Sequence, residues 1–486
     1  MASTLVPIGE PCGRGVIEAQ PCPRELGREI PHPHRRAVLV ACVLASSMAF
    51  IDGSVVTIAL PKLRAALATD LATVQWVTNS YVLALAALTL IGGALADSYG
   101  KARMLSLGCL MFGAASVACA LAPSIGWLIA ARVGQGTASA LVAPASLALI
   151  GAVYPKDERT GAIAIWAGAS ALATAAGPVV GGFLIETFGW QSVFWINPPI
   201  ALIVVVMLML FAPPDRLEQR RFDFLGAALL AGALGAMALA LSRLGASMAQ
   251  AAGAFGPDVV SIATGVLGLA GLAVYAWWER VSSHPMTPPR LAANRAFVGL
   301  NLATLLIYAG LAIMFFLLPF ELVDRRGLSM VEAGSAFLPF TLAVGLLSRP
   351  FSGLARTFGS RAMIIAGAIG AALAQTWLAL AQGAPLTWAV LAPQMLLGVS
   401  LAILVAPLTD SVLSSVSESD EGLASGINNA ASRVAQLAGV ALGAGLGSLS
   451  LGYKFGLLAA AAMSAAGAAT TALTVPPARP MSRDRR

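Results

Sequence analysis

Residues 92–103 read Gly92-Gly93-Ala94-Leu95-Ala96-Asp97-Ser98-Tyr99-Gly100-Lys101-Ala102-Arg103. This short polar stretch joins two apolar runs, 73–95 and 102–122, that lack the alternation of a β-strand. A run of about 20 apolar residues is long enough to cross a bilayer as a helix. Gly100 permits a tight turn between the two helices. The stretch therefore predicts a hairpin of two membrane helices.

The composition extends this prediction to the whole chain. Hydrophobic residues make up 58% and charged residues 11% of the 486 residues, whereas a soluble domain carries roughly a quarter charged residues. Because backbone polar groups in a bilayer must bond internally, we expect an all-α polytopic membrane protein. The net charge of +7 lies in short loops, which a membrane topology explains better than nucleic-acid binding. The sequence has no nucleophile–base set, phosphate loop or metal-ligand spacing, so we expect neither an enzyme nor a metal site.

Fourteen apolar runs bounded by charges, proline or glycine are candidate membrane helices. They cover 37–60, 73–95, 102–122, 126–151, 160–184, 192–212, 222–243, 256–278, 295–320, 330–353, 361–381, 386–408, 421–446 and 451–475. Of the 30 lysines and arginines, 22 fall in the leader, the even-numbered loops and the tail, six in the odd-numbered loops and two inside spans. By the positive-inside rule this bias places both termini in the cytoplasm.

Three short matches at a nearly constant offset indicate an internal duplication. Residues 97–101 align with 356–360, Ala143-Pro144 with Ala406-Pro407, and 177–181 with 439–443. Two six-helix halves with a site between them are a common plan of secondary transporters. The predicted organisation is a disordered tail at 1–36, a six-helix bundle at 37–212, two inserted helices at 213–290, a second six-helix bundle at 291–475 and a tail at 476–486.

Two charges in the first and fourth predicted helices are candidates for function. Asp52 lies inside a span, where a carboxylate costs about 2.5–3.5 kcal/mol on insertion scales and usually faces a cavity. A carboxyl group there can take up and release a proton, so Asp52 is a candidate for proton coupling; a structural bond to a neighbouring helix is the alternative. Arg132 cannot carry the proton, because a guanidinium stays charged. It either modulates the carboxylate or holds a polar network with Gln135.

Three further groups of residues have specific patterns. Asn429, Arg433 and Gln436 share one helix face, which lines a cavity or forms a buried packing network. The hairpin forms either a gate latch that differs between conformers or a solvated loop, and its candidate residues are Asp97, Gly100, Lys101 and Arg103. The fifth predicted helix has a motif that favours close packing and a bend, formed by Gly177, Pro178, Gly181 and Gly182.

With these residues the sequence resembles the major facilitator superfamily, specifically its fourteen-helix drug:proton antiporter branch. The resemblance rests on the segments 51–61, 75–81, 93–103, 132–136, 177–182 and 190–199. It implies that Asp52 is a coupling carboxylate, that Arg132 modulates its titration and that Asp97 is the gate latch. The polar candidates for the substrate cavity are Gln75, Asn79, Tyr81, Asn197, Asn429, Arg433 and Gln436. The tenth predicted helix lacks the embedded acid of some cationic-drug exporters in this branch, which argues against divalent-cation substrates.

The expected function is therefore proton-coupled antiport that exports lipophilic or amphipathic organic compounds by alternating access, as in multidrug efflux. The proton gradient would supply the energy without a cofactor, and we expect a monomer in the bacterial inner membrane. A dedicated transporter of one metabolite or lipid-like compound needs the same apolar cavity and stays an alternative. A receptor or scaffold is a weaker alternative, because it has no need of the intramembrane charges Asp52 and Arg132.

Overall fold

The computed structural model describes residues 33–214, 223–250, 259–282, 291, 293–417, 421–447 and 452–476. Most of the predicted tails, 1–36 and 476–486, and parts of the predicted insertion at 213–290 lie outside these residues. The described residues form helices and contain no strand, as the composition predicts.

The helices follow the predicted apolar runs, and each of the fourteen predicted ranges contains helix. They are α1 (Arg35–Ala66), α2 (Leu71–Tyr99), α3 (Lys101–Ala120), α4 (Ile125–Val153), α5 (Lys156–Phe188), α6 (Ser192–Trp195), α7 (Asn197–Phe211), α8 (Phe224–Gln250), α9 (Val259–Val281), α11 (Arg295–Phe320), α12 (Met330–Ser335), α13 (Leu338–Phe358), α14 (Ser360–Leu380), α15 (Ala392–Ser414), α16 (Glu421–Gly447) and α17 (Gly452–Thr474). There are also two short π-helical segments. The segment η1 (Glu321–Arg325) follows α11 directly, and η2 (Thr387–Leu391) directly precedes α15.

Fewer helices meet the length and hydropathy of a membrane span than the fourteen that the sequence predicts. Among the described residues, ten helices are long and apolar enough to cross a membrane, or up to twelve if the bent helices α2 and α5 each count as one span. The helices α8 and α16 are not in that set. In α16 the polar stripe around Arg433 lowers the hydropathy. The chain is a multi-pass membrane protein, and fourteen spans remain a prediction.

One pattern of helix packing occurs twice. In the N-terminal half α1 packs on α5 and α7, α4 packs on α2 and α3, and α3 packs on α7. In the C-terminal half α11 packs on α16 and α17, α15 packs on α13 and α14, and α14 packs on α17. The pairings correspond one to one. The turn glycines Gly100 and Gly359 hold equivalent places and both have positive φ, 106° and 81°. This repetition supports the duplication.

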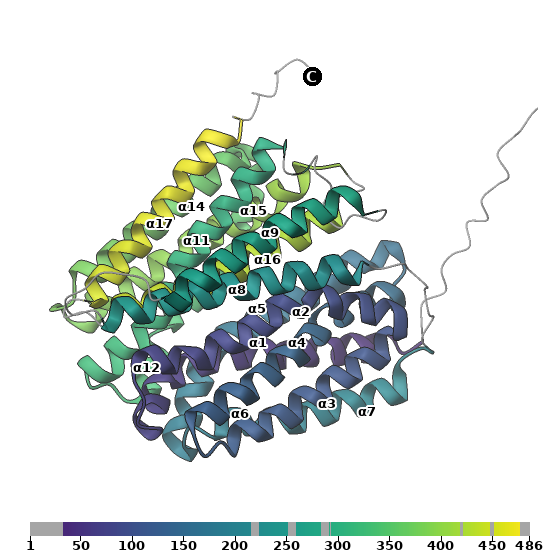
Figure 1. Ribbon diagram of the computed structural model, residues 1–486, viewed down its shortest axis with the longest axis horizontal. Coiled ribbons are helices and arrows are strands. Elements are labelled where there is room, and N and C mark those ends of the chain that lie inside the picture. Colours follow the sequence, from purple (N-terminus) through teal and green to yellow (C-terminus); the bar gives the residue numbers. More distant parts are fainter. Residues whose placement is uncertain are drawn as a thin grey trace, which may run out of the picture.

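The pair α8 and α9 lies against both halves. The two helices pack on each other, and α8 also packs on α2 and α16, which belong to different halves. In Figure 1 this teal pair lies between the purple-to-blue helices of the N-terminal half and the green-to-yellow helices of the C-terminal half. Apolar side chains of α9 such as Val266 and Leu267 are exposed, as expected of a surface that faces lipid.

Candidate functional site: a cavity between the halves

A cavity of about 670 Å³ lies between the two halves. The N-terminal half lines it with α1, α2, α4 and α5, and the C-terminal half with the equivalent helices α11, α13, α15 and α16. Ligand cavities of proteins have volumes of about 300–1,000 Å³. The interface of the two repeats is also where secondary transporters hold their substrates. The cavity is therefore the candidate binding site.

The C-terminal half gives this cavity an aromatic wall and a polar wall. Phe315 stacks on Phe337 with ring centroids 6.0 Å apart and meets Phe340 edge-on at 5.2 Å, and all three rings line the cavity. The polar wall is one face of α16, with Ser425, Asn428, Asn429, Ser432, Arg433 and Gln436 at helical spacing. The predicted stripe of Asn429, Arg433 and Gln436 thus lies along the cavity.

Asp52 of α1 lies in a fully buried polar cluster beside the cavity. Its carboxylate forms an ion pair with Arg132 Nη1 of α4. It also accepts hydrogen bonds from Gln135 Nε2 at 3.2 Å and Asn197 Nδ2 at 3.1 Å. Ser116 Oγ accepts from the same two amides, at 3.0 and 2.9 Å, and donates to the carbonyl of Phe194. Three side chains, from α4 and α7, thus hold the carboxylate in one position.

Arg132 connects this cluster to the cavity. Its Nε donates to the carbonyl of Val77 at 2.9 Å, and Nη1 also donates to Gln135 Oε1 at 2.8 Å. Its guanidinium lies 4.2 Å from the ring centroid of Tyr81, a cation–π distance. The Tyr81 hydroxyl is 2.8 Å from Ser139 Oγ. Arg132, Tyr81 and Ser139 line the cavity whereas Asp52 does not, so the carboxylate lies deeper than the guanidinium.

The glycine and proline motif of α5 brings three helices together. A Cβ atom at Gly177 would overlap the Ser54 side chain of α1, and one at Gly182 would overlap the Met330 carbonyl of α12. The segments Gly161–Thr174 and Ala176–Phe188 of α5 meet at an angle of 40°. Pro178 accounts for the place of this bend, because it lacks the amide hydrogen that would bond the carbonyl of Thr174. The motif thus combines the predicted close packing with the predicted bend.

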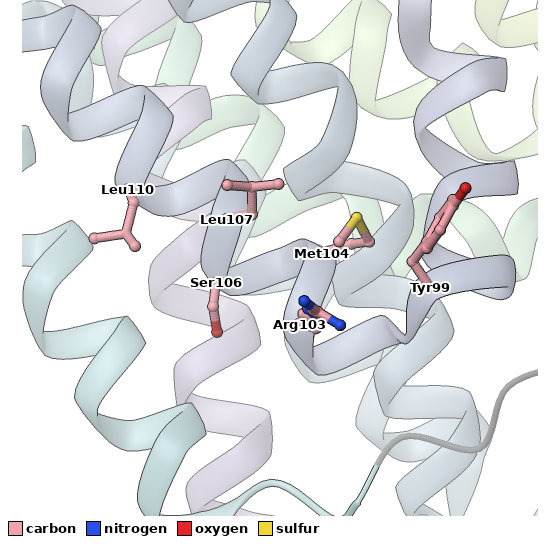
Figure 2. A pocket seen from close by; sticks show the side chains of 6 residues that line it. All are labelled: Tyr99, Arg103, Met104, Ser106, Leu107 and Leu110. Atoms are coloured by element: carbon pink, nitrogen blue, oxygen red, sulfur yellow. The ribbon is translucent and has the colours of Figure 1, made fainter.

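The hairpin between α2 and α3 lies at one end of the bundle. Gly100 ends α2 and begins α3, and its φ of 106° is a conformation that favours glycine. Arg103 is exposed and lines a surface pocket with Tyr99, Met104, Ser106, Leu107 and Leu110 (Figure 2). Among the residues that the structure describes, Asp97 makes no hydrogen bond or ion pair. The role of this hairpin as a gate latch therefore stays a prediction.

At the opposite end the two halves are joined. Arg64 at the end of α1 forms an ion pair with Asp324 of η1 at 2.9 Å. Glu186 of α5 accepts a hydrogen bond from the amide of Val331 in α12 at 2.9 Å. The cavity, in contrast, extends to Thr409, Val412 and Leu413 near the end of α15, on the side of the Asp97 hairpin. This conformer is closed at the Arg64 end.

Several predicted cavity residues lie elsewhere. Asn197 belongs to the Asp52 cluster, and neither it nor Gln75 nor Asn79 lines the cavity. Thr78, Tyr81 and Val82 of α2 do line it, and Asn79 lies about 100° around the helix from Thr78. Gln75 lies about one helical turn before Thr78, nearer the closed end. Ser116 and Ser139 are not predicted from the sequence, since serine is common in apolar helices and gives no signal by itself.

The sequence matches one protein family, and a solved structure shares the fold of this chain. The sequence matches the Major Facilitator Superfamily over residues 42–303 and 300–486. It is 32% identical to the multidrug resistance protein Stp of Mycobacterium tuberculosis, over 83% of this chain and 74% of that protein. It is 34% identical to the cephamycin export protein of Amycolatopsis lactamdurans, over 81% of each chain. The crystal structure of a D-xylose–proton symporter has a similar fold, with a TM-score of 0.67, 15% identity and coverage of 91% of this chain and 98% of that one.

Proposed function

Because this chain belongs to the Major Facilitator Superfamily, a family of transporters and not of enzymes, we propose that it is a proton-coupled antiporter that exports lipophilic or amphipathic organic compounds. The observation that carries the proposal is the cavity between the halves with the buried Asp52–Arg132 pair beside it. The cavity offers a substrate apolar walls and a few polar groups. Among the residues described in the bundle interior, Asp52 is the one carboxylate that is bonded to a side chain lining the cavity.

The proposed coupling follows from the position of the pair. With Asp52 ionised, its charge holds Arg132 in place. A proton on Asp52 removes that attraction and leaves the guanidinium with only neutral partners, namely the Val77 carbonyl, Gln135 and the ring of Tyr81 at the cavity. Proton binding and substrate binding would then change the same side chains. Alternating access would break the Arg64–Asp324 contact at one end and close the Asp97 hairpin at the other.

The names of the relatives support export. One is named for multidrug resistance, which fits efflux of several lipophilic compounds. Another is named for export of a single compound, which supports the alternative that this chain is a dedicated exporter. A multidrug exporter and a dedicated exporter would both use the same membrane setting, cavity and coupling carboxylate. They differ in how many compounds the cavity accepts.

Transport in proteoliposomes under an imposed pH gradient tests the proposal. We expect wild type to move a lipophilic fluorescent dye only with the gradient, and Asp52→Asn to lose that dependence, because the amide cannot take up the proton. Asp70→Asn is the matched control: Asp70 is an exposed helix cap of α2, and asparagine caps a helix equally well. Gradient-driven transport that survives in Asp52→Asn would refute the role of Asp52. Transport by wild type that ignores the gradient would refute proton coupling.

A further inference from the structure

The charge of the cavity points to its substrate class. Among its described lining residues there is no aspartate or glutamate, while two arginines, Arg132 and Arg433, are present. Arg132 is neutralised by Asp52. Arg433 makes no ion pair or hydrogen bond with any residue that the structure describes. Among the described residues, nothing compensates the positive charge that Arg433 places in this cavity.

The surroundings of Arg433 leave this charge available to a ligand. Arg433 is only partly buried, and it lies on the polar face of α16 between Asn429 and Gln436. The ionisable groups that act on it are the phenols of Tyr81 and Tyr308, one from each half. Neutral phenols cannot balance a guanidinium. Its neighbour Asn428 is occupied by bonds to Asn301 and Thr304, at 3.2 and 2.9 Å.

We propose that this cavity binds organic anions, with Arg433 as the residue that contacts the acidic group. The proposal rests on the proposed transport function and adds its substrate class: an aromatic or otherwise flat apolar body that ends in a carboxylate. The body would pack on the rings of Phe315, Phe337 and Phe340. The carboxylate would accept charge-assisted hydrogen bonds from Arg433, and a guanidinium presents two parallel donors to such a group. A positive head group would meet repulsion at the same place.

Binding to purified protein in phosphatidylcholine nanodiscs tests this class without any transport step. The probes are three dansyl compounds with one body and different ends: dansylglycine (carboxylate), dansylglycinamide (neutral) and dansylethylenediamine (ammonium). Energy transfer from tryptophan to dansyl reports binding, with empty nanodiscs as the blank. We expect wild type to bind dansylglycine about tenfold or more tightly than the amide, and the ammonium probe least, as charge-assisted hydrogen bonds predict.

Substitutions assign the preference to one side chain. Arg433→Gln should bring the carboxylate and amide probes to within about twofold of each other. Arg433→Lys should keep a smaller preference for the carboxylate, because the ammonium group retains the charge but lacks the two parallel donors. Arg295→Gln, which changes an arginine of α11 outside the cavity lining, should leave the preference unchanged. The ranking of the three probes by wild type stands as a test even if Arg433→Gln fails to fold. Equal binding of the ammonium probe, no binding of any probe by folded wild type, or a carboxylate preference that survives in Arg433→Gln would overturn the proposal. Anion-selective binding without gradient-driven transport would uphold the anion site and refute the proposed function. Gradient-driven transport without anion-selective binding would uphold the proposed function and refute the anion site.

Discussion

Asp52 and Arg132 are fully buried, and each is the other's ionic partner. Two opposite charges in such a place are costly to desolvate, and their attraction offsets that cost only while both are present. Removing one partner leaves the other charge unpaired. When both residues are replaced by neutral ones, there is neither a desolvation cost nor an attraction to lose. The two residues should therefore behave as one unit in stability measurements.

This coupling is measurable in a double-mutant cycle. We expect Asp52→Asn to lower the free energy of unfolding by about 3–5 kcal/mol, because it leaves a buried guanidinium that cannot lose its charge. Arg132→Gln should cost less, because the remaining carboxyl group can take up a proton. The double variant should lose clearly less than the sum of the two. Chemical unfolding of the protein in detergent gives the free energy of unfolding of each of the three variants. Losses that add up in the double variant would contradict the coupling between Asp52 and Arg132.

For single residues, the sequence predicts the two buried charges but not all of the side chains that bond to them. Asp52 and Arg132 stand out because charged side chains inside apolar runs are rare. Gln135 is found with Arg132 because it lies three positions further along one helix. Ser116 and Asn197 come from α3 and α7, and their approach to Asp52 depends on how those helices pack on α1 and α4. Sequence spacing holds no information on that packing.

At the scale of helices and their ends, the contacts at the Arg64 end control which side of the cavity is closed. The Arg64–Asp324 pair is partly exposed, and such pairs contribute about 0.2–1 kcal/mol. We expect Arg64→Ala to shift the population toward the conformer open at this end by up to about fivefold. The charge-swapped variant, Arg64→Asp with Asp324→Arg, should restore the wild-type distribution.

Reaction of a single cysteine measures this shift. Thr57 lines the cavity from α1, so Thr57→Cys in a background without the native cysteines reports access from either side. A membrane-impermeant maleimide added at the Arg64 end should label Arg64→Ala faster than its parent. Lys62→Ala is the control, because Lys62 is an exposed basic residue of the same helix end. Equal labelling rates in all variants would mean that the ion pair does not hold this end closed.

Helix positions are predicted well because apolar length and bounding charges determine them, and the errors have local causes. The first helix continues past the predicted end at residue 60 to Ala66. Pro61 lies inside it, and Arg64 finds its partner on η1. The predicted helix at 192–212 is divided into α6 and α7, with proline in the first turn of α7. Such breaks depend on neighbouring helices that receive the freed backbone groups.

For the molecule as a whole, the sidedness of the cavity follows from two separate arguments. The structure closes the cavity at the Arg64 end, and the distribution of lysine and arginine predicts that the opposite end lies in the cytoplasm. If the predicted orientation holds, this conformer is the one that takes up a substrate from the cytoplasm. That is the starting point of an export cycle. The direction of transport can therefore be inferred from this conformer only together with the orientation of the chain in the membrane.

The orientation and the number of spans can be measured with one set of fusions. Alkaline phosphatase is active only outside the cytoplasm, and green fluorescent protein fluoresces only inside it. With fourteen spans, α8 and α9 both cross, so fusions after residues 66 and 250 should give phosphatase activity and fusions after 282 and 476 should give fluorescence. If α8 lies along the surface, the fusion after 250 fluoresces and the one after 282 gives phosphatase activity. Phosphatase activity after 476 would place the C-terminus outside. It would contradict both the charge bias and the assignment of this conformer to the cytoplasmic side.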